Sequence, residues 1–374
     1  MPTRVPARRA FGALVATGAL VLAGCTTQDP GSSDGGSSSS GPSASPSAAA
    51  EEPNELLVLE WAGYDAPDFW IDFQEASPDT DVTFEFGDTD ANILSQMEAG
   101  SEADIFHFYT GWQGFYVDQG LVQEIDTSKL TNWDKVPDAY KELGQIDGKQ
   151  YFIPWDWGFT SILYNTDEVP EVTSWDVLLD PQYADHISMW NDGPGAVTVS
   201  SYIHGYDETA ITDEQLADIE AEWIAQKPLN AFYWSSETEL CPAVSDGTVW
   251  IAYAWQGCYA LALTDGAPVA YANPEEGRNS WVGLYGINAN SESPELAHEF
   301  LDLKLAEASC RAAVELFYYG CANGDVMEAV DDPFLIEVFS LDDPSILETT
   351  NFTPNVTQEQ RDAWTAMWER VQAE

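Results

Sequence analysis

Strand-like and helix-like patterns alternate through most of this chain, from residue 55 to its end. Buried-strand patterns occur at 55–61, 81–88 and 103–110, and apolar residues at helical spacing lie between them at 67–76 and 91–100. Later segments repeat the alternation, with amphipathic helices predicted at 212–227 and 357–372. Strands that alternate with helices pair in parallel in a sheet that helices cover, so the predicted fold class is α/β.

Aromatic residues gather where the predicted strands end. The strand ends read EWAGY (60–64), YTGW (109–112), MWNDGPG (189–195) and YAWQG (253–257), and RNSW (278–281) opens the last crossing. Ligands of open α/β sheets bind beyond the carboxyl ends of the strands. The segment YFIPWDWGFTSILYN (151–165) adds six more aromatic residues and places Asp156 between two tryptophans. We therefore expect these rings to converge on one cleft.

The first residues have the pattern of an export signal. Arg4, Arg8 and Arg9 precede a short apolar run, and LAGC ends at Cys25. This order is typical of a bacterial lipoprotein signal at 1–24, and the arginine pair also fits twin-arginine export. Residues 25–53 are mostly Ser, Gly, Pro, Ala and acids, a composition that favours a disordered tether. We expect a lipid on Cys25 and a location at the outer face of the cytoplasmic membrane.

The net charge narrows the choice of partners. The chain has 13 Lys and Arg against 64 Asp and Glu, and removal of three signal arginines leaves 10 − 64 = −54. Such a charge repels a phosphate backbone, so nucleic acid is excluded as a partner. It favours cationic or neutral ligands over anions, although solubility alone also explains a high acidic content.

Four cysteines remain once Cys25 carries lipid: Cys241, Cys258, Cys310 and Cys321. An even number outside the cell indicates two disulfides. Pairing of sequence neighbours joins Cys241 to Cys258 and Cys310 to Cys321, although four cysteines allow three pairings. Metal-ligand spacing such as CxxC is missing from the sequence, so we expect neither a metal nor a cofactor.

Several motifs in one order resemble the solute-binding proteins of ABC importers, in particular the spermidine/putrescine-binding family. They are Trp61-x-x-Tyr64-x-x-Pro67, GLVQEID (120–126), the segment 151–165, TSWDVLLDPQY (173–183) and NPEEG (273–277). The resemblance implies two hinged α/β lobes of the type II periplasmic-binding-protein class, each a mixed sheet with flanking helices. It places lobe 1 at 54–160 plus 282–331, and lobe 2 at 161–281 plus 332–374.

The resemblance also implies which residues bind the ligand. The binding positions of the family match Trp61, Tyr64, Asp192, Trp255, Trp281 and Tyr319 in this sequence. We add two aromatic residues from the ring-rich strands, Tyr109 and Trp157, although Trp157 fits a core role equally well. Arg278 could meet a ligand carboxylate or serve as a surface charge. Two acids that grip polyamine ammoniums in the family fall on Gly195 and Gly283 here.

The predicted site then consists of aromatic rings around one acid, Asp192. Such a site predicts a small organic cation or zwitterion, polyamine-like or quaternary ammonium, as the ligand. The predicted protein is a monomeric receptor that delivers its ligand to ABC permease subunits. Alternatives are a sugar stacked on the tryptophans, ferric iron at Tyr318 and Tyr319, and a secreted hydrolase. Neither a GxSxG nor an HExxH motif occurs, so we do not expect an enzyme.

Overall fold

A computed structural model describes residues 54–343, 346 and 349–374. The predicted signal peptide, the lipidated Cys25 and nearly all of the predicted tether, up to residue 53, lie outside the described residues. Within the described part, the α/β prediction is confirmed, and the strands expected at 55–61, 81–88 and 103–110 form within a residue or two of those bounds.

One mixed sheet of eleven strands carries the described part of the chain, in the order β2-β1-β3-β11-β6-β9-β7-β8, with β10 and β12 beside β6 and β13 beside β11. A separate hairpin joins β4 to β5. The strands are β1 Glu55–Trp61, β2 Asp81–Gly87, β3 Ile105–Tyr109, β4 Gln145–Ile146, β5 Lys149–Gln150, β6 Phe152–Asn165, β7 Ile187–Trp190, β8 Asn230–Trp234, β9 Ile251–Trp255, β10 Val269–Tyr271, β11 Asn279–Ile287, β12 Gly320–Cys321 and β13 Asn351–Phe352.

Helices follow most of the strands, and two of them begin with a complete capping box. Thr212 and Thr357 each accept a hydrogen bond from the backbone three residues on, and a glutamine returns it. The helices are α1 Ile71–Ala76, α2 Asp90–Glu98, α3 Gln113–Asp118, α4 Asp138–Leu143, α5 Gly193–His204, α6 Asp213–Gln226, α7 Glu237–Ser245, α8 Gln256–Asp265, α9 Pro294–Lys304, α10 Glu307–Ala312, α11 Gly324–Glu328, α12 Pro333–Phe339 and α14 Gln358–Ala373.

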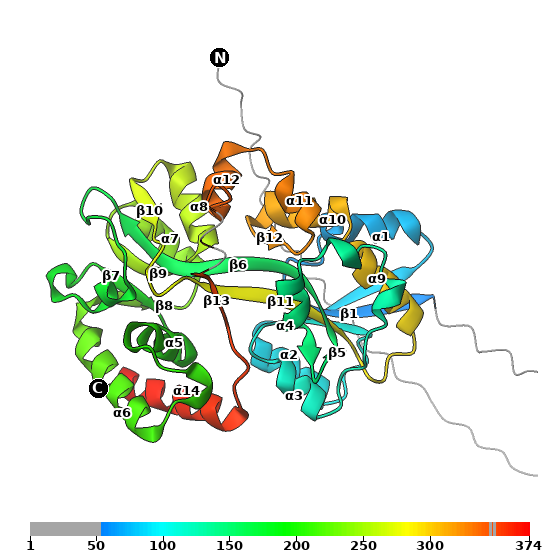
Figure 1. Cartoon of the computed structure of the whole chain (residues 1–374), viewed down its shortest axis with the longest axis horizontal. Helices are drawn as coiled ribbons and strands as arrows, with labels where there is room; N and C mark the ends of the chain where they lie inside the picture. Colours follow the sequence, from blue (N-terminus) through cyan, green and yellow to red (C-terminus); the bar gives the residue numbers. More distant parts are fainter. Residues whose placement is uncertain (1–53, 344–345, 347–348) are drawn as a thin grey trace, which may run out of the picture. The chain divides into compact units, whose positions relative to one another are not determined.

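The strand β6 connects the two ends of the sheet. Its first part, Phe152 to Thr160, pairs antiparallel with β11, and its last part, Thr160 to Tyr164, pairs antiparallel with β9. Parallel pairs lie on each side, β1 with β2 and β3, and β7 with β8 and β9. Figure 1 shows β6 running from the group of β7, β8 and β9 toward the group of β1 and β11. The ring-rich segment therefore forms the central strand of the fold from Phe152 onward, and all residues of β6 are buried.

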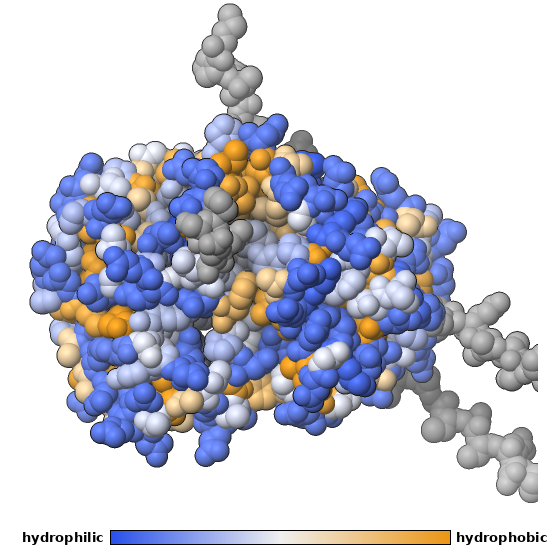
Figure 2. Space-filling view, in the orientation of Figure 1, coloured by the Kyte–Doolittle hydropathy of each residue, from blue (hydrophilic) through white to orange (hydrophobic). Residues whose placement is uncertain are grey.

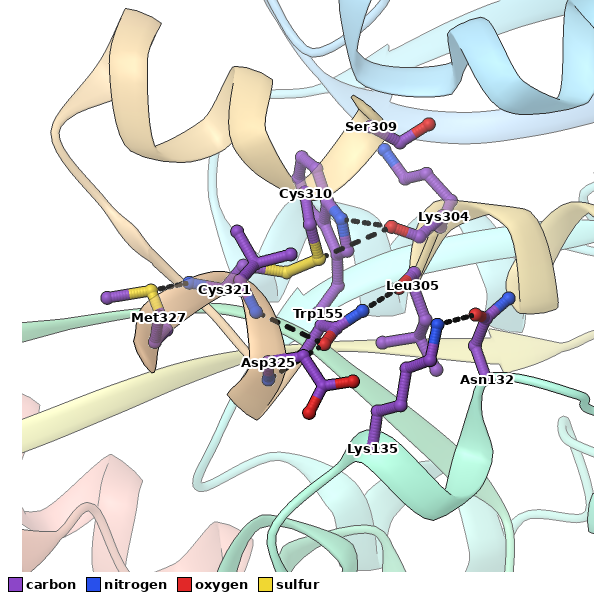
Figure 3. Close-up of a disulfide and its surroundings, with 12 residues drawn as sticks. Asn132, Lys135, Trp155, Lys304, Leu305, Ser309, Cys310, Cys321, Asp325 and Met327 are labelled. Carbon is purple, nitrogen blue, oxygen red and sulfur yellow. Dashed lines mark hydrogen bonds between the residues drawn. A yellow bond between two sulfur atoms is a disulfide. The ribbon is translucent and has the colours of Figure 1, made fainter. Parts of the chain in front are cut away.

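Both disulfides join the cysteine pairs that neighbour each other in sequence. Cys241 on α7 bonds to Cys258 on α8, and Cys310 on α10 bonds to Cys321 on β12, which confirms that pairing. In Figure 3 the second disulfide lies beside Trp155 of β6, whose indole N–H donates to the Lys304 carbonyl at 2.9 Å. The disulfide thus anchors β12, and the residues just before it, next to the central strand.

The surface matches the acidic composition. Figure 2 shows a face made mainly of hydrophilic residues, with small hydrophobic groups between them. In the described part of the chain, no helix combines the length and the apolar character that a membrane crossing requires.

Candidate functional site

Strand pairing brings ring-bearing residues onto one face of the sheet. Trp281 of β11 pairs with Gly158, and Trp255 of β9 pairs with Thr160, two residues further along β6. Directly paired residues share a face, as do residues two apart in one strand. A Cβ atom at 158 would overlap the Trp281 indole, so the glycine lets that ring lie against the β6 backbone. Rings from β9 and β11 therefore stand together over the middle of β6.

The rings form two connected groups. In the first, the centroid distances are 5.3 Å from Trp61 to Tyr109, 5.2 Å from Tyr109 to Trp281 and 4.7 Å from Trp281 to Tyr319. These four side chains are each partly exposed, and they come from four separate segments. In the second group, Trp255 packs edge-on against Trp190 at 5.5 Å and Trp234 at 5.1 Å.

Beneath the first group lies the acid of the ring-rich segment, Asp156. Its Oδ2 accepts a hydrogen bond from the Tyr64 hydroxyl at 2.9 Å, and that hydroxyl also lies 2.8 Å from the Tyr109 hydroxyl. The other oxygen, Oδ1, is buried without a hydrogen-bond partner and lies 3.5 Å from His107 Nε2. The carboxylate is fully buried, with the Tyr64 hydroxyl bonded to one oxygen and His107 facing the other.

Behind His107, the network continues to two more charged groups. His107 Nδ1 lies 2.7 Å from Glu60 Oε2, Tyr285 donates to Glu60 Oε1, and Lys304 Nζ lies 3.9 Å from the same oxygen. Burial lowers the pKa of His107, but Glu60 and Asp156 outweigh it and raise the value to about 9. Burial lowers the pKa of Lys304 to about 8, against the opposing effect of Glu60. The buried network thus holds two acids and two bases at close range.

Two further acids lie on the other side of β6. Asp192 caps α5 and accepts the Gly195 N–H at 2.7 Å, while burial raises its pKa to about 6. Glu237 begins α7, its Oε1 is buried without a partner, and burial raises its pKa to about 7. Both Glu237 and Asp156 act electrostatically on the Tyr319 hydroxyl, so this ring lies within reach of both carboxylates.

The comparisons with known proteins identify the family of this chain. Residues 71–333 match the model of the bacterial extracellular solute-binding protein family, which is well over half of the chain. This chain belongs to that family. It is therefore a solute-binding protein of an ABC importer and not an enzyme, which removes the hydrolase alternative.

Named relatives match this solute-binding protein over most of their own length. The spermidine/putrescine-binding periplasmic protein of Escherichia coli is 26% identical over 74% of this chain and 80% of its own. The spermidine/putrescine transporter substrate-binding protein of Streptococcus pneumoniae superposes with a TM-score of 0.73 at 18% identity, covering 85% of this chain and 98% of its own. A lipoprotein of Treponema pallidum superposes with a TM-score of 0.72 at 15% identity, over 86% and 100%. The fold is thus the two-lobed periplasmic-binding-protein fold.

Two of the residues predicted for the site, Trp157 and Arg278, are buried and make internal contacts. Trp157 is buried, donates its indole N–H to the Cys321 carbonyl at 3.1 Å, and packs against Tyr140, Phe159 and Phe339. Arg278 is also buried, and its guanidinium donates to the carbonyls of Ala272 and Tyr271 and to Ser340 Oγ. The solute-binding protein therefore uses both side chains in internal contacts, and Arg278 is not the surface charge that its sequence context allowed.

Sequence reasoning did not select His107, Asp156 or Glu237 as site residues of the solute-binding protein. Asp156 carried a signal, because it is an acid inside a run of aromatic residues that the structure buries completely. Glu237 follows a strand that ends in Phe232, Tyr233 and Trp234, so a ring-rich strand end was a signal there too, although nothing set this acid apart from the rest of the 64 acids. Only the folded chain shows that these acids lie close to Tyr319.

Proposed function

We propose that this protein is a lipid-anchored receptor that captures a small organic cation or zwitterion, polyamine-like or quaternary ammonium, and delivers it to an ABC permease. One observation carries the ligand class: partly exposed rings from four separate segments meet over the buried carboxylate of Asp156. The relatives named as spermidine/putrescine-binding proteins support the same class.

Aromatic faces attract a cation by about 0.5 to 2 kcal/mol each, with the larger values in desolvated sites. A buried ammonium also needs a carboxylate or several hydrogen bonds. Asp156 on one side of the site, and Asp192 and Glu237 on the other, are buried acids near these rings. The strongly negative chain would attract a cation before it meets the site.

The proposed action is closure of two lobes on the ligand. We keep the boundaries 54–160 plus 282–331 for lobe 1 and 161–281 plus 332–374 for lobe 2. The central strand β6 changes its partner from β11 to β9 near Thr160, which supports a crossing between lobes at that point. A ligand that contacts both lobes favours the closed form, and the closed form would dock on the permease.

The proposed anchor is a lipid on Cys25 followed by the tether at 26–53, which would hold a monomeric receptor at the outer face of the cytoplasmic membrane. Metabolic labelling with a radioactive fatty acid tests it in cells that express the full chain. Label on the wild type and none on Cys25→Ala is the expected result. Equal labelling of both chains would contradict the anchor.

A thermal-shift panel tests the ligand class. We expect one or more of putrescine, spermidine, choline and glycine betaine to raise the melting temperature. A ligand at 100 times its Kd adds about 2.7 kcal/mol of stability. Stabilisation by sugars alone would instead favour a carbohydrate receptor, and a visible charge-transfer band with iron would favour a ferric receptor. Either result, together with an unchanged melting temperature in the presence of every organic cation, overturns the proposed ligand class.

A further inference from the structure

A side chain at position 283 would occupy the same space as the carboxylate of Asp156. The pairing of β6 with β11 is shifted between Val282, which faces Trp157, and Leu284, which faces Pro154. Gly283 therefore opposes two residues, Trp155 and Asp156, as in a β-bulge. A Cβ atom at 283 would overlap Asp156 Oδ1 and would come 2.5 Å from His107 Nε2. A side chain at 283 and the carboxylate of Asp156 thus exclude each other.

This exclusion bears on the acid that is missing at 283. The resemblance places a ligand-gripping acid at that position in the polyamine-binding family, and this chain has glycine there. The carboxylate of Asp156 fills the space into which a residue at 283 would extend. The neighbouring strand β6 therefore supplies a carboxylate at the place that a side chain at 283 would take.

One carboxylate oxygen of Asp156 has no hydrogen-bond donor, although it is buried beside Gly283 and His107. Oδ2 is occupied by the Tyr64 hydroxyl, but Oδ1 has no hydrogen-bond partner, and His107 Nε2 at 3.5 Å is too far for a good hydrogen bond. A buried carboxylate oxygen without a donor costs free energy, so a ligand N–H that reaches it gains a strong charge-assisted bond. The Tyr109 ring next to it is partly exposed, and it contacts Trp281 and Trp61.

We propose that Asp156 Oδ1 receives a hydrogen bond from a protonated primary amine of the ligand, in the role that an acid at 283 has in the polyamine-binding family. This inference rests on the proposed function and narrows it. A ligand with N–H donors is preferred over a quaternary ammonium, because methyl groups cannot donate to Oδ1.

Calorimetric titration of four purified proteins with putrescine tests the proposal. Asp156→Asn keeps the shape and removes the charge, and we expect at least a tenfold loss of affinity. The double variant Asp156→Gly with Gly283→Asp returns the carboxylate to the neighbouring strand, and we expect at least half of that loss, on a logarithmic scale, to be recovered. Asp104→Asn is the control, since Asp104 is a buried acid that bonds to Leu57 N and Ser291 away from the rings. It leaves the affinity unchanged.

A second measurement needs no variant. On the wild type, putrescine is expected to bind at least tenfold more tightly than its permethylated analogue, 1,4-bis(trimethylammonio)butane. Wild-type binding of putrescine that survives Asp156→Asn unchanged, or equal affinity for the two diamines, overturns this inference and leaves the proposed function standing. Failure of every organic cation to bind the wild type overturns both.

Discussion

The protonation of the His107 imidazole sets the charge between the two buried acids Glu60 and Asp156. The His107 ring faces Glu60 on β1, Asp156 on β6 and the rings of Tyr64, Tyr109 and Tyr285, and Lys304 on α9 lies 3.9 Å from the far oxygen of Glu60. With a pKa of about 9 in the folded protein, against an ordinary value of 6.5, the imidazolium form is favoured by the fold. Its stabilising contribution is complete below about pH 6.5 and is lost as the pH rises through 9.

The first prediction concerns this pH dependence. Between pH 6.5 and 8, the free energy of unfolding of the wild type should fall by about 1 kcal/mol per pH unit relative to His107→Gln. Above pH 8 the buried Lys304 opposes the effect, because its folded pKa of about 8 lies below the ordinary value. Urea unfolding at pH 6.5, 7.2 and 8.0 measures the two slopes. Parallel slopes would show that His107 is neutral in the folded protein.

Trp255 is the residue-scale test of the second ring group. Its indole is partly exposed beside Trp190 and Trp234, and Trp255→Ala removes a wall of the proposed site. We expect an affinity at least tenfold weaker for the best cation in the panel, measured by calorimetry. Trp70→Ala is the matched control, because that partly buried indole packs on Phe84 outside both ring groups. Equal affinities would remove Trp255 from the site.

At the scale of elements, the strand–helix alternation was sufficient to predict α/β, and the positions of β1, β2, β3, α6 and α14 follow from it. The antiparallel centre did not follow from the pattern, since strand–helix alternation by itself predicts parallel pairing. The bulge opposite Gly283 could not be predicted either, because it depends on how two strands that are far apart in the sequence align. For that reason Asp156 was noticed in the sequence, yet only the register shows that it takes the place of a residue at 283.

The disulfide between Cys310 and Cys321 is an element-scale device that places Tyr319. It closes a loop of 11 residues, and Tyr319 lies two residues before Cys321, where its ring meets Trp281. Replacing both cysteines with alanine should cost about 3 kcal/mol of stability. We also expect a weaker affinity, because the Tyr319 ring is less restrained.

Chemical denaturation and calorimetry of this double variant measure the two effects. The pair Cys241→Ala and Cys258→Ala is the control for stability, since its loop of 17 residues has a similar entropic effect. An affinity equal to that of the wild type in the Cys310 and Cys321 variant, with the stability lowered, would show that Tyr319 is positioned without the disulfide.

At the scale of the whole molecule, Arg361 connects the C-terminal helix α14 to the strand-end loop at Gly111. Its Nη2 donates to the Gly111 carbonyl at 2.8 Å, and its guanidinium lies 4.0 Å from the centre of the Trp112 ring. Gly111 belongs to the proposed lobe 1 and α14 to the proposed lobe 2. Asp90 and Asp192, one from each proposed lobe, both act on this guanidinium electrostatically.

Arg361→Gln should therefore shift the protein toward an open form. We expect a larger radius of gyration without ligand in small-angle scattering, and an affinity several-fold weaker, since a smaller fraction is then ready to bind. Arg370→Gln is the control, because Arg370 lies on the same helix but pairs with Glu220 at the surface. Identical scattering from wild type and Arg361→Gln would contradict a role in closure.

The position of a bound diamine is the most direct test of the whole account. A crystal structure of the protein with putrescine is expected to place one ligand nitrogen within hydrogen-bond distance of Asp156 Oδ1, with the carbon chain between the rings of Tyr109, Trp281 and Tyr319. A putrescine molecule bound only at surface acids, with these rings still in mutual contact, would contradict it.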